Sequence, residues 1–227
     1  MKKTAAALLL LCLFALASCS PATVQTQTAA VQSASADTPS AQKTPAPVLF
    51  SDDFENGLSS WNVEDGFAAV DDGGNTVLEG TGHKWARQEG GDFENFALSV
   101  RFRQISGTMH FNCMTDNQTG DRYFIGVGGQ DLYLNKQRGS EMSDVIQTPI
   151  NLGEGWHTIE IKCFSGLLNV SVDGALYMVY RDADPLLSGG IAFEVLEDSD
   201  FMLDDVMVTE TAEQDMETSE TALHIES

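Results

Sequence analysis

The chain has 227 residues, enough for one large domain with appendages or for two small domains. Its 34 acidic residues outnumber its 12 lysines and arginines, which gives a formal net charge of -22 at pH 7. A nucleic-acid partner is disfavoured, because polyanion binding needs clustered basic groups that neutralise phosphates. An acidic surface does keep exported proteins soluble and can attract divalent cations.

The amino terminus has the features of a bacterial export signal. Lys2 and Lys3 form a short positive segment, and residues 6–17 form an apolar run too short for a comfortable membrane span. The junction LASC, which ends at Cys19, resembles the lipobox of bacterial lipoproteins. This resemblance implies a signal peptide over residues 1–18, cleavage before Cys19, and acyl chains such as palmitate on that residue. We expect a protein that is lipid-anchored to the membrane of the bacterial cell envelope and faces outward. The alternative is an ordinary secretory signal with a coincidental cysteine.

The residues between the signal and the first strand predict a tether. Residues 19–47 are dominated by Ala, Thr, Ser, Gln and Pro, with almost no large apolar side chain. Such a segment cannot bury enough surface to offset the entropy of ordering, so we expect a disordered linker. At the other end, residues 209–227 are acidic and contain no lysine or arginine, which predicts a solvated tail. One folded domain is therefore expected over residues 48–208.

Residues 48–208 have the pattern of a β protein. Apolar side chains alternate with polar ones in several segments, as Leu98, Val100 and Phe102 do. Asp173-Gly174 is a strong signal for a type I′ hairpin, and Gly128-Gly129 is a second hairpin signal. Many short strands with frequent turns predict an all-β sandwich of two antiparallel sheets. The predicted strands cover residues 76–81, 96–105, 108–115, 122–127, 131–136, 156–164, 167–172, 175–180, 190–196 and 201–208.

Several segments resemble exported concanavalin A-like jelly-roll domains. They are LFSDDFENGLSSW at residues 49–61, GDFENFALSVRFR at 91–103, the hairpin at 122–136, the segment at 156–177 and the closing FMLDDVMV. The similarity is to the laminin-G-like group that includes the domain named 3-keto-disaccharide hydrolase. It implies a jelly-roll β-sandwich and a role in binding or cleaving glycans, although one fold hosts many functions.

The catalytic signature of the related glucanases is missing. That motif, Glu-x-Asp-x-(x)-Glu, places two carboxylates on one face of a strand. The nearest match, Glu194 to Asp198, lacks the middle aspartate and the alternation. Related hydrolase-like domains carry an arginine where this chain has Cys113 and Met114. We therefore expect no catalytic residues and a non-catalytic carbohydrate-binding domain. The alternatives are a glycoside hydrolase acting on a disaccharide or polysaccharide, and a structural or adhesion module that binds protein.

Candidate carbohydrate-binding residues combine aromatic rings with hydrogen-bonding groups. Trp85 lies in GHKWARQ next to donors and charges that suit a glycan. Alternation places further polar side chains on the outer face of two strands that we expect to be neighbours. The alternatives are a strand tryptophan buried for packing and an ordinary solvated face. The candidate residues are Trp85, Arg87, Arg101, Arg103, His110, Asn112 and Arg122.

The last predicted strand carries two adjacent acids, Asp204 and Asp205. Alternation places Asp204 on the side of Val206 and Val208, so its carboxylate is expected to be buried and to need a partner. In jelly-roll carbohydrate-binding modules that this chain resembles, an aspartate of the last strand joins oxygens near the first strand around a structural calcium. The resemblance implies a calcium site at Asp204 with Asp52, Asp53 or Glu55 near the first strand, and we take Asp53 and Asp204 as the candidate ligands. The alternative is that Asp204 is satisfied by hydrogen bonds from a neighbouring loop.

Two cysteines remain within the expected domain, Cys113 and Cys163. Alternation turns both sulfurs towards the core side of their strands. A cysteine pair in an exported domain is a candidate for one disulfide. The alternative is a pair of separate buried thiols.

Overall fold

The computed structural model describes residues 44–218. These residues are mostly strand, and a short 3-10 helix, η1 (Glu213–Asp215), follows the last strand. The predicted signal peptide, the lipidated Cys19 and residues 19–43 of the predicted tether lie outside the described residues. In residues 44–218 there is no helix long and apolar enough to cross a membrane.

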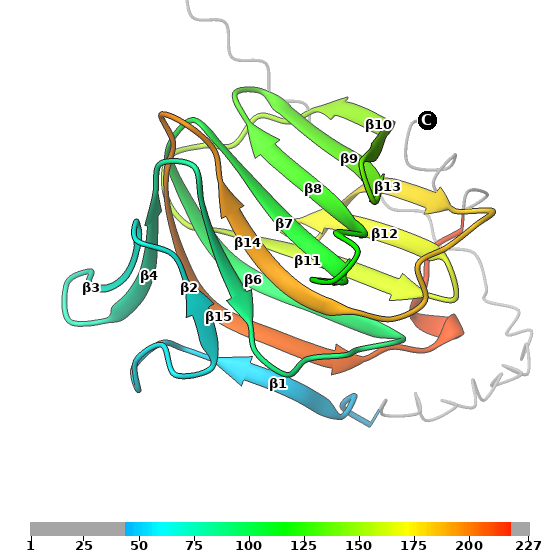
Figure 1. Cartoon of the computed structure of the whole chain (residues 1–227), viewed down its shortest axis with the longest axis horizontal. Helices are drawn as coiled ribbons and strands as arrows, with labels where there is room; N and C mark the ends of the chain where they lie inside the picture. Colours follow the sequence, from blue (N-terminus) through cyan, green and yellow to red (C-terminus); the bar gives the residue numbers. More distant parts are fainter. Residues whose placement is uncertain (1–43, 219–227) are drawn as a thin grey trace, which may run out of the picture. The chain divides into compact units, whose positions relative to one another are not determined.

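The described residues form two antiparallel sheets that lie face to face, so the predicted all-β jelly-roll sandwich is confirmed (Figure 1). Sheet A has the order β13 (Ala175–Arg181), β12 (Leu167–Val172), β11 (His157–Phe164), β6 (Phe96–Ser106), β15 (Asp200–Glu210), β4 (Thr76–Thr81) and β3 (Phe67–Asp71), and β1 (Val48–Asp52) pairs with the second half of β15. Sheet B has the order β10 (Glu141–Pro149), β9 (Asp131–Arg138), β8 (Arg122–Gly128), β7 (Thr108–Thr115), β14 (Gly190–Val195), β5 (Lys84–Gln88) and β2 (Trp61–Val63).

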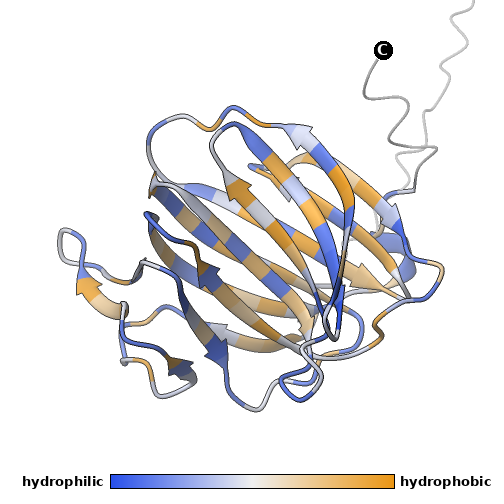
Figure 2. Cartoon of the chain, turned by 45° about the horizontal axis from the view of Figure 1, so that its top comes forward, coloured by the Kyte–Doolittle hydropathy of each residue, from blue (hydrophilic) through white to orange (hydrophobic). Residues whose placement is uncertain are grey.

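The core lies between the two sheets because one face of nearly every strand is apolar. Hydrophobic and hydrophilic residues alternate visibly along the strands (Figure 2). Phe102 of sheet A meets Phe111 of sheet B edge to face, with ring centroids 5.4 Å apart. Trp61 stacks on Phe193 at 5.1 Å. Each such ring contributes about 2 kcal/mol through removal of apolar surface from water.

The two predicted hairpins are present. Asp173 and Gly174 both have positive φ, at 50° and 77°, as a type I′ turn requires. The second turn lies one residue later than predicted, because Gly128 still pairs with Asp131 and the turn falls on residues 129–130.

The folded region continues beyond the predicted boundary at residue 208. Strand β15 runs to Glu210, and Thr211 and Met216 are each only 8% exposed. The side chain of the buried Asn169 pairs with the backbone of Glu217: its Nδ2 donates to the carbonyl at 3.1 Å and its Oδ1 accepts from the N–H at 2.6 Å. The first part of the predicted solvated tail therefore packs on sheet A, because it supplies the hydrogen bonds that a buried amide needs.

Candidate functional site

The outer face of sheet B brings together most of the candidate binding residues. In β7, Met109 and Phe111 enter the core, so His110 and Asn112 point away from it. The same alternation operates along β5, β8, β9 and β14. We call the resulting surface the polar face; its residues are Trp85, Arg87, His110, Asn112, Arg122, Phe124, Tyr133 and Glu194.

Arg101 and Arg103 do not belong to this face. Both lie on β6, which is part of sheet A, whereas the next strand, β7, belongs to sheet B. The chain crosses from one sheet to the other at Gly107, where φ is +71° and an added Cβ would collide with Ser199. The prediction that β6 and β7 are neighbours on one face is therefore wrong. The two arginines instead lie over Trp156, with their guanidinium carbons 4.6 and 5.2 Å from the ring centroid.

Cations and rings alternate along the polar face. The guanidinium carbon of Arg87 lies 4.4 Å from the Trp85 ring centroid, and that of Arg122 lies 5.0 Å from it. Arg122 also lies 5.3 Å from the Phe124 ring, which contacts the His110 ring at 4.6 Å. Trp85 is thus a half-buried surface residue rather than part of the core. These contacts hold the side chains in a defined row, since each cation–π pair contributes about 0.5–1 kcal/mol.

Arg122 carries a charge with few partners. Its Nε is buried and has no hydrogen-bond partner within the described residues. Burial lowers the pKa of the Arg122 guanidinium, the charge of Glu194 opposes this shift, and Arg87 adds to it. The neighbouring Asn112 is fully buried, and its Oδ1 likewise lacks a partner in residues 44–218.

A chain of hydrogen bonds crosses the polar face. Nε2 of His83 lies 3.1 Å from Oε1 of Glu194, and Nδ1 of His110 lies 2.7 Å from Oε2. The other nitrogen of His110 lies 2.7 Å from the hydroxyl of Tyr133. Of these four residues, only His110 was predicted from the sequence as a binding residue. Glu194 belongs to the segment that fails to match the catalytic motif, and neither His83 nor Tyr133 was predicted to bind a ligand.

The buried Glu194 is ionised by its partners. Burial by itself would raise the pKa of this carboxyl, but the hydrogen bond and charge of His110, the hydrogen bond of His83 and the charge of Arg122 outweigh it, so the pKa is lowered. Burial and then the Glu194 charge raise the pKa of Tyr133, so its hydroxyl keeps its proton. The chain therefore joins a carboxylate to a protonated phenol through one imidazole.

Tyr133 reaches His110 only because Gly126 has no side chain. Tyr133 lies on β9 opposite Gly126 of β8, and its ring crosses that strand towards β7. A Cβ at Gly126 would lie 1.9 Å from Cζ of Tyr133. In the sequence, a glycine inside a strand was the one signal of this close approach.

A groove of about 620 Å³ opens beside this hydrogen-bond chain. His110, Phe124 and Tyr133 line it from β7, β8 and β9, and β10 contributes Val145 and Ile146. Ligand sites for small molecules have volumes of roughly 300–1,000 Å³. The groove is therefore large enough for a saccharide unit.

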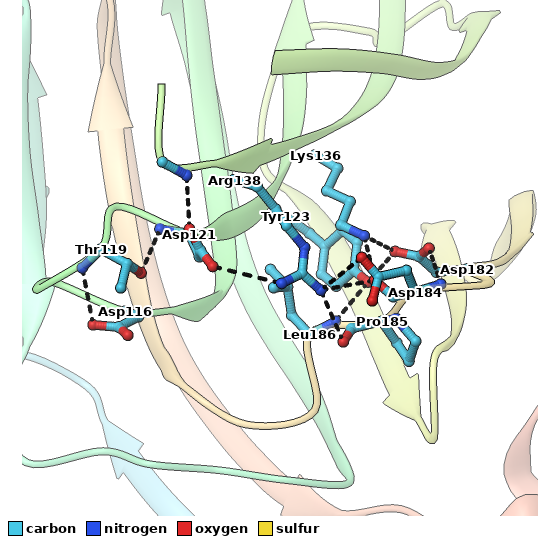
Figure 3. A network of polar contacts seen from close by, with 11 residues as sticks. Asp116, Thr119, Asp121, Tyr123, Lys136, Arg138, Asp182, Asp184, Pro185 and Leu186 are labelled. Carbon is cyan, nitrogen blue, oxygen red and sulfur yellow. Dashed lines mark hydrogen bonds and ion pairs between the residues drawn. The ribbon is translucent and has the colours of Figure 1, made fainter. Parts of the chain in front are cut away.

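A smaller pocket of about 150 Å³ lies at Trp85, Arg87 and Arg122, and the loop at residues 115–121 forms its other side. A polar network holds that end of sheet B in place (Figure 3). Asp121 accepts from the Gly139 N–H at 2.7 Å, and Asp182 pairs with Lys136 at 2.6 Å and accepts from Tyr123 at 2.5 Å.

The two predicted calcium ligands, Asp53 and Asp204, differ in their exposure to solvent. Asp204 is 2% exposed, whereas Asp53 is exposed and accepts from the Glu55 N–H at 3.2 Å. Asp204 accepts from Arg101 at 3.2 Å, from Asn75 at 2.9 Å and from the Asp205 N–H at 2.8 Å. Among the described residues, no group of three or more His, Cys, Asp or Glu side chains could hold a metal ion. Calcium at these positions stays a prediction.

The burial of Asp204 was predicted correctly, but the face of β15 on which its side chain lies was not. Asp205 has φ of 47°, and the register of β15 against β6 shifts between Asp204 and Met207. This β-bulge changes the phase of the alternation, so Asp204 lies opposite Arg101 rather than on the side of Val206.

Cys113 and Cys163 both point into the core, as predicted. They come from opposite sheets, and their sulfurs lie 3.7 Å apart as thiols. Hydrogen bonding to Cys113 and then burial raise the pKa of the Cys163 thiol well above its usual value. The disulfide itself stays a prediction.

Comparison with solved structures identifies the fold. The carbohydrate binding module CBM66 from Bacillus subtilis matches with a TM-score of 0.56 and 11% identity over 67% of this chain and 97% of that chain. A Bacillus subtilis protein with a galectin-like fold matches with a TM-score of 0.63 and 13% identity over 74% and 97%. The laminarinase catalytic domain from Thermotoga maritima matches with a TM-score of 0.58 and 13% identity over 74% and 100%.

No family model and no curated protein matches the sequence. The likeness to the solved structures, at these identities, concerns the fold alone. Both binding modules and glycoside hydrolases share it. The chain has the jelly-roll β-sandwich fold that these solved structures share.

Proposed function

We propose that the domain is a non-catalytic carbohydrate-binding module that binds glycans on the outer face of sheet B. The observation that carries the proposal is the row of rings and hydrogen-bonding groups, from Trp85 to Tyr133, beside a groove of about 620 Å³. Sugar rings present apolar faces for stacking and hydroxyls for directional hydrogen bonds, and this face offers partners for both. The module among the fold neighbours agrees with this use of the fold.

Glycoside hydrolysis is the alternative, and the state of Glu194 argues against this residue as its general acid. Hydrolysis needs one carboxyl that is protonated near neutral pH and a second that is ionised. Both oxygens of Glu194 are engaged by histidines, and its pKa is lowered, which is the opposite of what a general acid needs.

Anchoring belongs to the same proposal. A lipid on Cys19 would hold the module at the membrane of the cell envelope, with residues 20–43 between anchor and domain, and the support is the lipobox-like LASC in the sequence. The wild-type protein should incorporate labelled palmitate in the expressing bacterium, and Cys19→Ser should not. Equal labelling of the two proteins, or no labelling of the wild type, would contradict the anchor.

The binding proposal is tested by affinity electrophoresis of residues 44–218 in gels that contain laminarin or mixed-linkage glucan. Retardation without shortening of the polymer is expected. Trp85→Ala should abolish most of the retardation, because it removes a ring of the polar face. Trp156→Ala is the matched control: this tryptophan also lies under two arginines, but beside sheet A.

Three outcomes would contradict the proposal in different ways. Release of reducing ends from the polymer would establish a hydrolase. An equal loss in both tryptophan variants would mean that the site is elsewhere. No retardation by any polysaccharide of a wider panel would favour a structural module that binds protein.

A further inference from the structure

In the hydrogen-bond chain on the polar face, the donor and the acceptor between His110 and Glu194 are fixed. An ionised carboxylate only accepts hydrogen bonds, so Nδ1 of His110 must donate to Glu194. The other nitrogen of His110 lies 2.7 Å from the hydroxyl of Tyr133, so the imidazole occupies one side of this oxygen. The remaining hydrogen-bonding capacity of the Tyr133 hydroxyl is left for a group in the groove.

The acidic side chains of the groove disfavour an anionic ligand. Its lining includes the carboxylates of Asp131 and Asp144 and contains no lysine or arginine among the described residues. The formal net charge of the whole chain is negative as well, at -22. An anionic ligand would meet acceptors and negative charge, whereas a ligand rich in hydroxyl groups would supply the donors that these oxygens need.

The apolar part of the lining fits the same ligand class. Phe124, Val145, Ile146 and Leu196 border the groove, so carbon–hydrogen faces of a sugar ring can pack there while its hydroxyls reach the oxygens.

We propose that the groove between β7 and β10 selects uncharged saccharides, and that Tyr133 is its specificity-determining hydrogen-bonding residue, held in place by Glu194 through His110. The inference rests on the proposed binding function and adds a ligand class and a residue to it. Glu194 and His110 are positioning residues: their hydrogen bonds hold the Tyr133 hydroxyl at the groove.

The ligand class is tested with matched polymers. Laminarin and mixed-linkage glucan are compared with carboxymethylated forms of the same polymers, which keep the backbone and add negative charge. Isothermal titration of residues 44–218 should give binding of the neutral polymers and binding at least about tenfold weaker for the charged forms, the size expected when like charges replace hydroxyl donors.

The residue is tested with variants on a neutral polymer. Tyr133→Phe should bind about tenfold more weakly, because it removes one hydrogen-bonding hydroxyl. Gly126→Ala should do the same, because its Cβ displaces the Tyr133 ring. Tyr177→Phe on sheet A is the control and should bind as wild type.

A double-variant cycle separates orientation from general structural support. Glu194→Gln keeps the volume but removes the charge that orients His110, so it should weaken binding about as much as Tyr133→Phe. In the Tyr133→Phe background the same change should cost nothing further, because the group that it orients is gone. A purely structural role of Glu194 would give additive losses in binding. Circular dichroism of each variant verifies folding.

The outcomes distinguish this inference from the function on which it rests. Equal or tighter binding of the carboxymethylated polymers, or wild-type affinity in Tyr133→Phe, would overturn the inference and leave the binding function standing. Absence of binding of any polymer by the wild-type domain would overturn both.

Discussion

The guanidinium of Arg101 lies 3.2 Å from the carboxylate of Asp204, directly opposite it on the neighbouring strand. This pair explains how a strand in the middle of sheet A holds a nearly buried acid. Arg101→Ala should lower the free energy of unfolding by about 1–3 kcal/mol, because it leaves a buried charge with neutral partners only. The value is below that of a fully buried pair, since the arginine side chain is 38% exposed. Urea unfolding at pH 7 measures it.

Arg103→Ala is the matched control for this prediction. Arg103 lies on the same strand and over the same Trp156 ring, but its partner Asp72 is 30% exposed. The expected loss is under about 1 kcal/mol. Equal losses in the two variants would mean that the arginines act through Trp156 and not through the buried acid.

The calcium prediction can be tested on the same residues. If a metal binds at Asp204, millimolar Ca²⁺ should raise the unfolding temperature relative to EDTA, and Asp204→Asn should remove that increase. An unfolding temperature that does not change between Ca²⁺ and EDTA would contradict calcium there and leave Arg101 as the partner of the charge.

Alternation predicted strands well but could not predict which sheet each strand joins. β6 and β7 were located within a residue of their observed ends because apolar and polar side chains alternate strictly along them. Pairing between strands depends on long-range contacts, so the assignment of Arg101 and His110 to one face failed. The strands β1, β2, β3 and β5 were missed because they are short, and β10 because its residues are mostly exposed.

The candidate site was predicted in part for the same reasons. Trp85 and His110 stood out by residue type and by their outward position. Tyr133 did not, because its role depends on the space above Gly126, which no periodicity reveals. Asp204 was expected to be buried, but the bulge at Asp205 that turns it towards Arg101 is a local backbone feature that a two-residue period cannot describe.

Asp182 is predicted to make stability depend on pH. Burial would raise its pKa, but Lys136, Tyr123 and the Asp184 N–H together lower it. A lowered folded-state pKa means that the stabilisation is present above the unfolded pKa and is lost as the pH falls through the folded one. Asp182→Asn should therefore cost about 3 kcal/mol at pH 7, and the difference from wild type should shrink below about pH 4. Urea unfolding across this range measures both.

Asp184→Asn is the control, since its carboxylate is 82% exposed and its ion pair with Arg138 contributes little. It should leave the stability within about 0.5 kcal/mol of wild type at every pH. A wild-type minus Asp182→Asn difference that stayed constant down to pH 3 would show that the loss at residue 182 is not electrostatic.

The two core cysteines are predicted to be unreactive in the folded, reduced domain. The raised pKa of Cys163 keeps its thiolate scarce, and both sulfurs are buried. A thiol reagent such as Ellman's should react only as fast as the domain unfolds, and in urea it should find both thiols. Rapid reaction at native conditions would contradict the buried pair.

The predicted disulfide has a separate test. Protein exported to an oxidising compartment should show no free thiol in urea and a mass lower by a pair of hydrogens. Closing a loop between residues 50 positions apart would contribute about 4 kcal/mol by the chain-entropy relation. Two free thiols in the exported protein would contradict the bond.

Residues 209–217 are predicted to be part of the folded domain. A chain that stops at Val208 loses the buried Met216 and leaves the Asn169 amide, which is 3% exposed, without its two backbone partners on Glu217. Loss of the apolar contact and the orphaned amide together should cost about 3 kcal/mol. Urea unfolding of chains 44–208 and 44–218 measures the difference, and Met216→Ala in the longer chain isolates the apolar share. Equal midpoints for the two chains would mean that this segment does not stabilise sheet A.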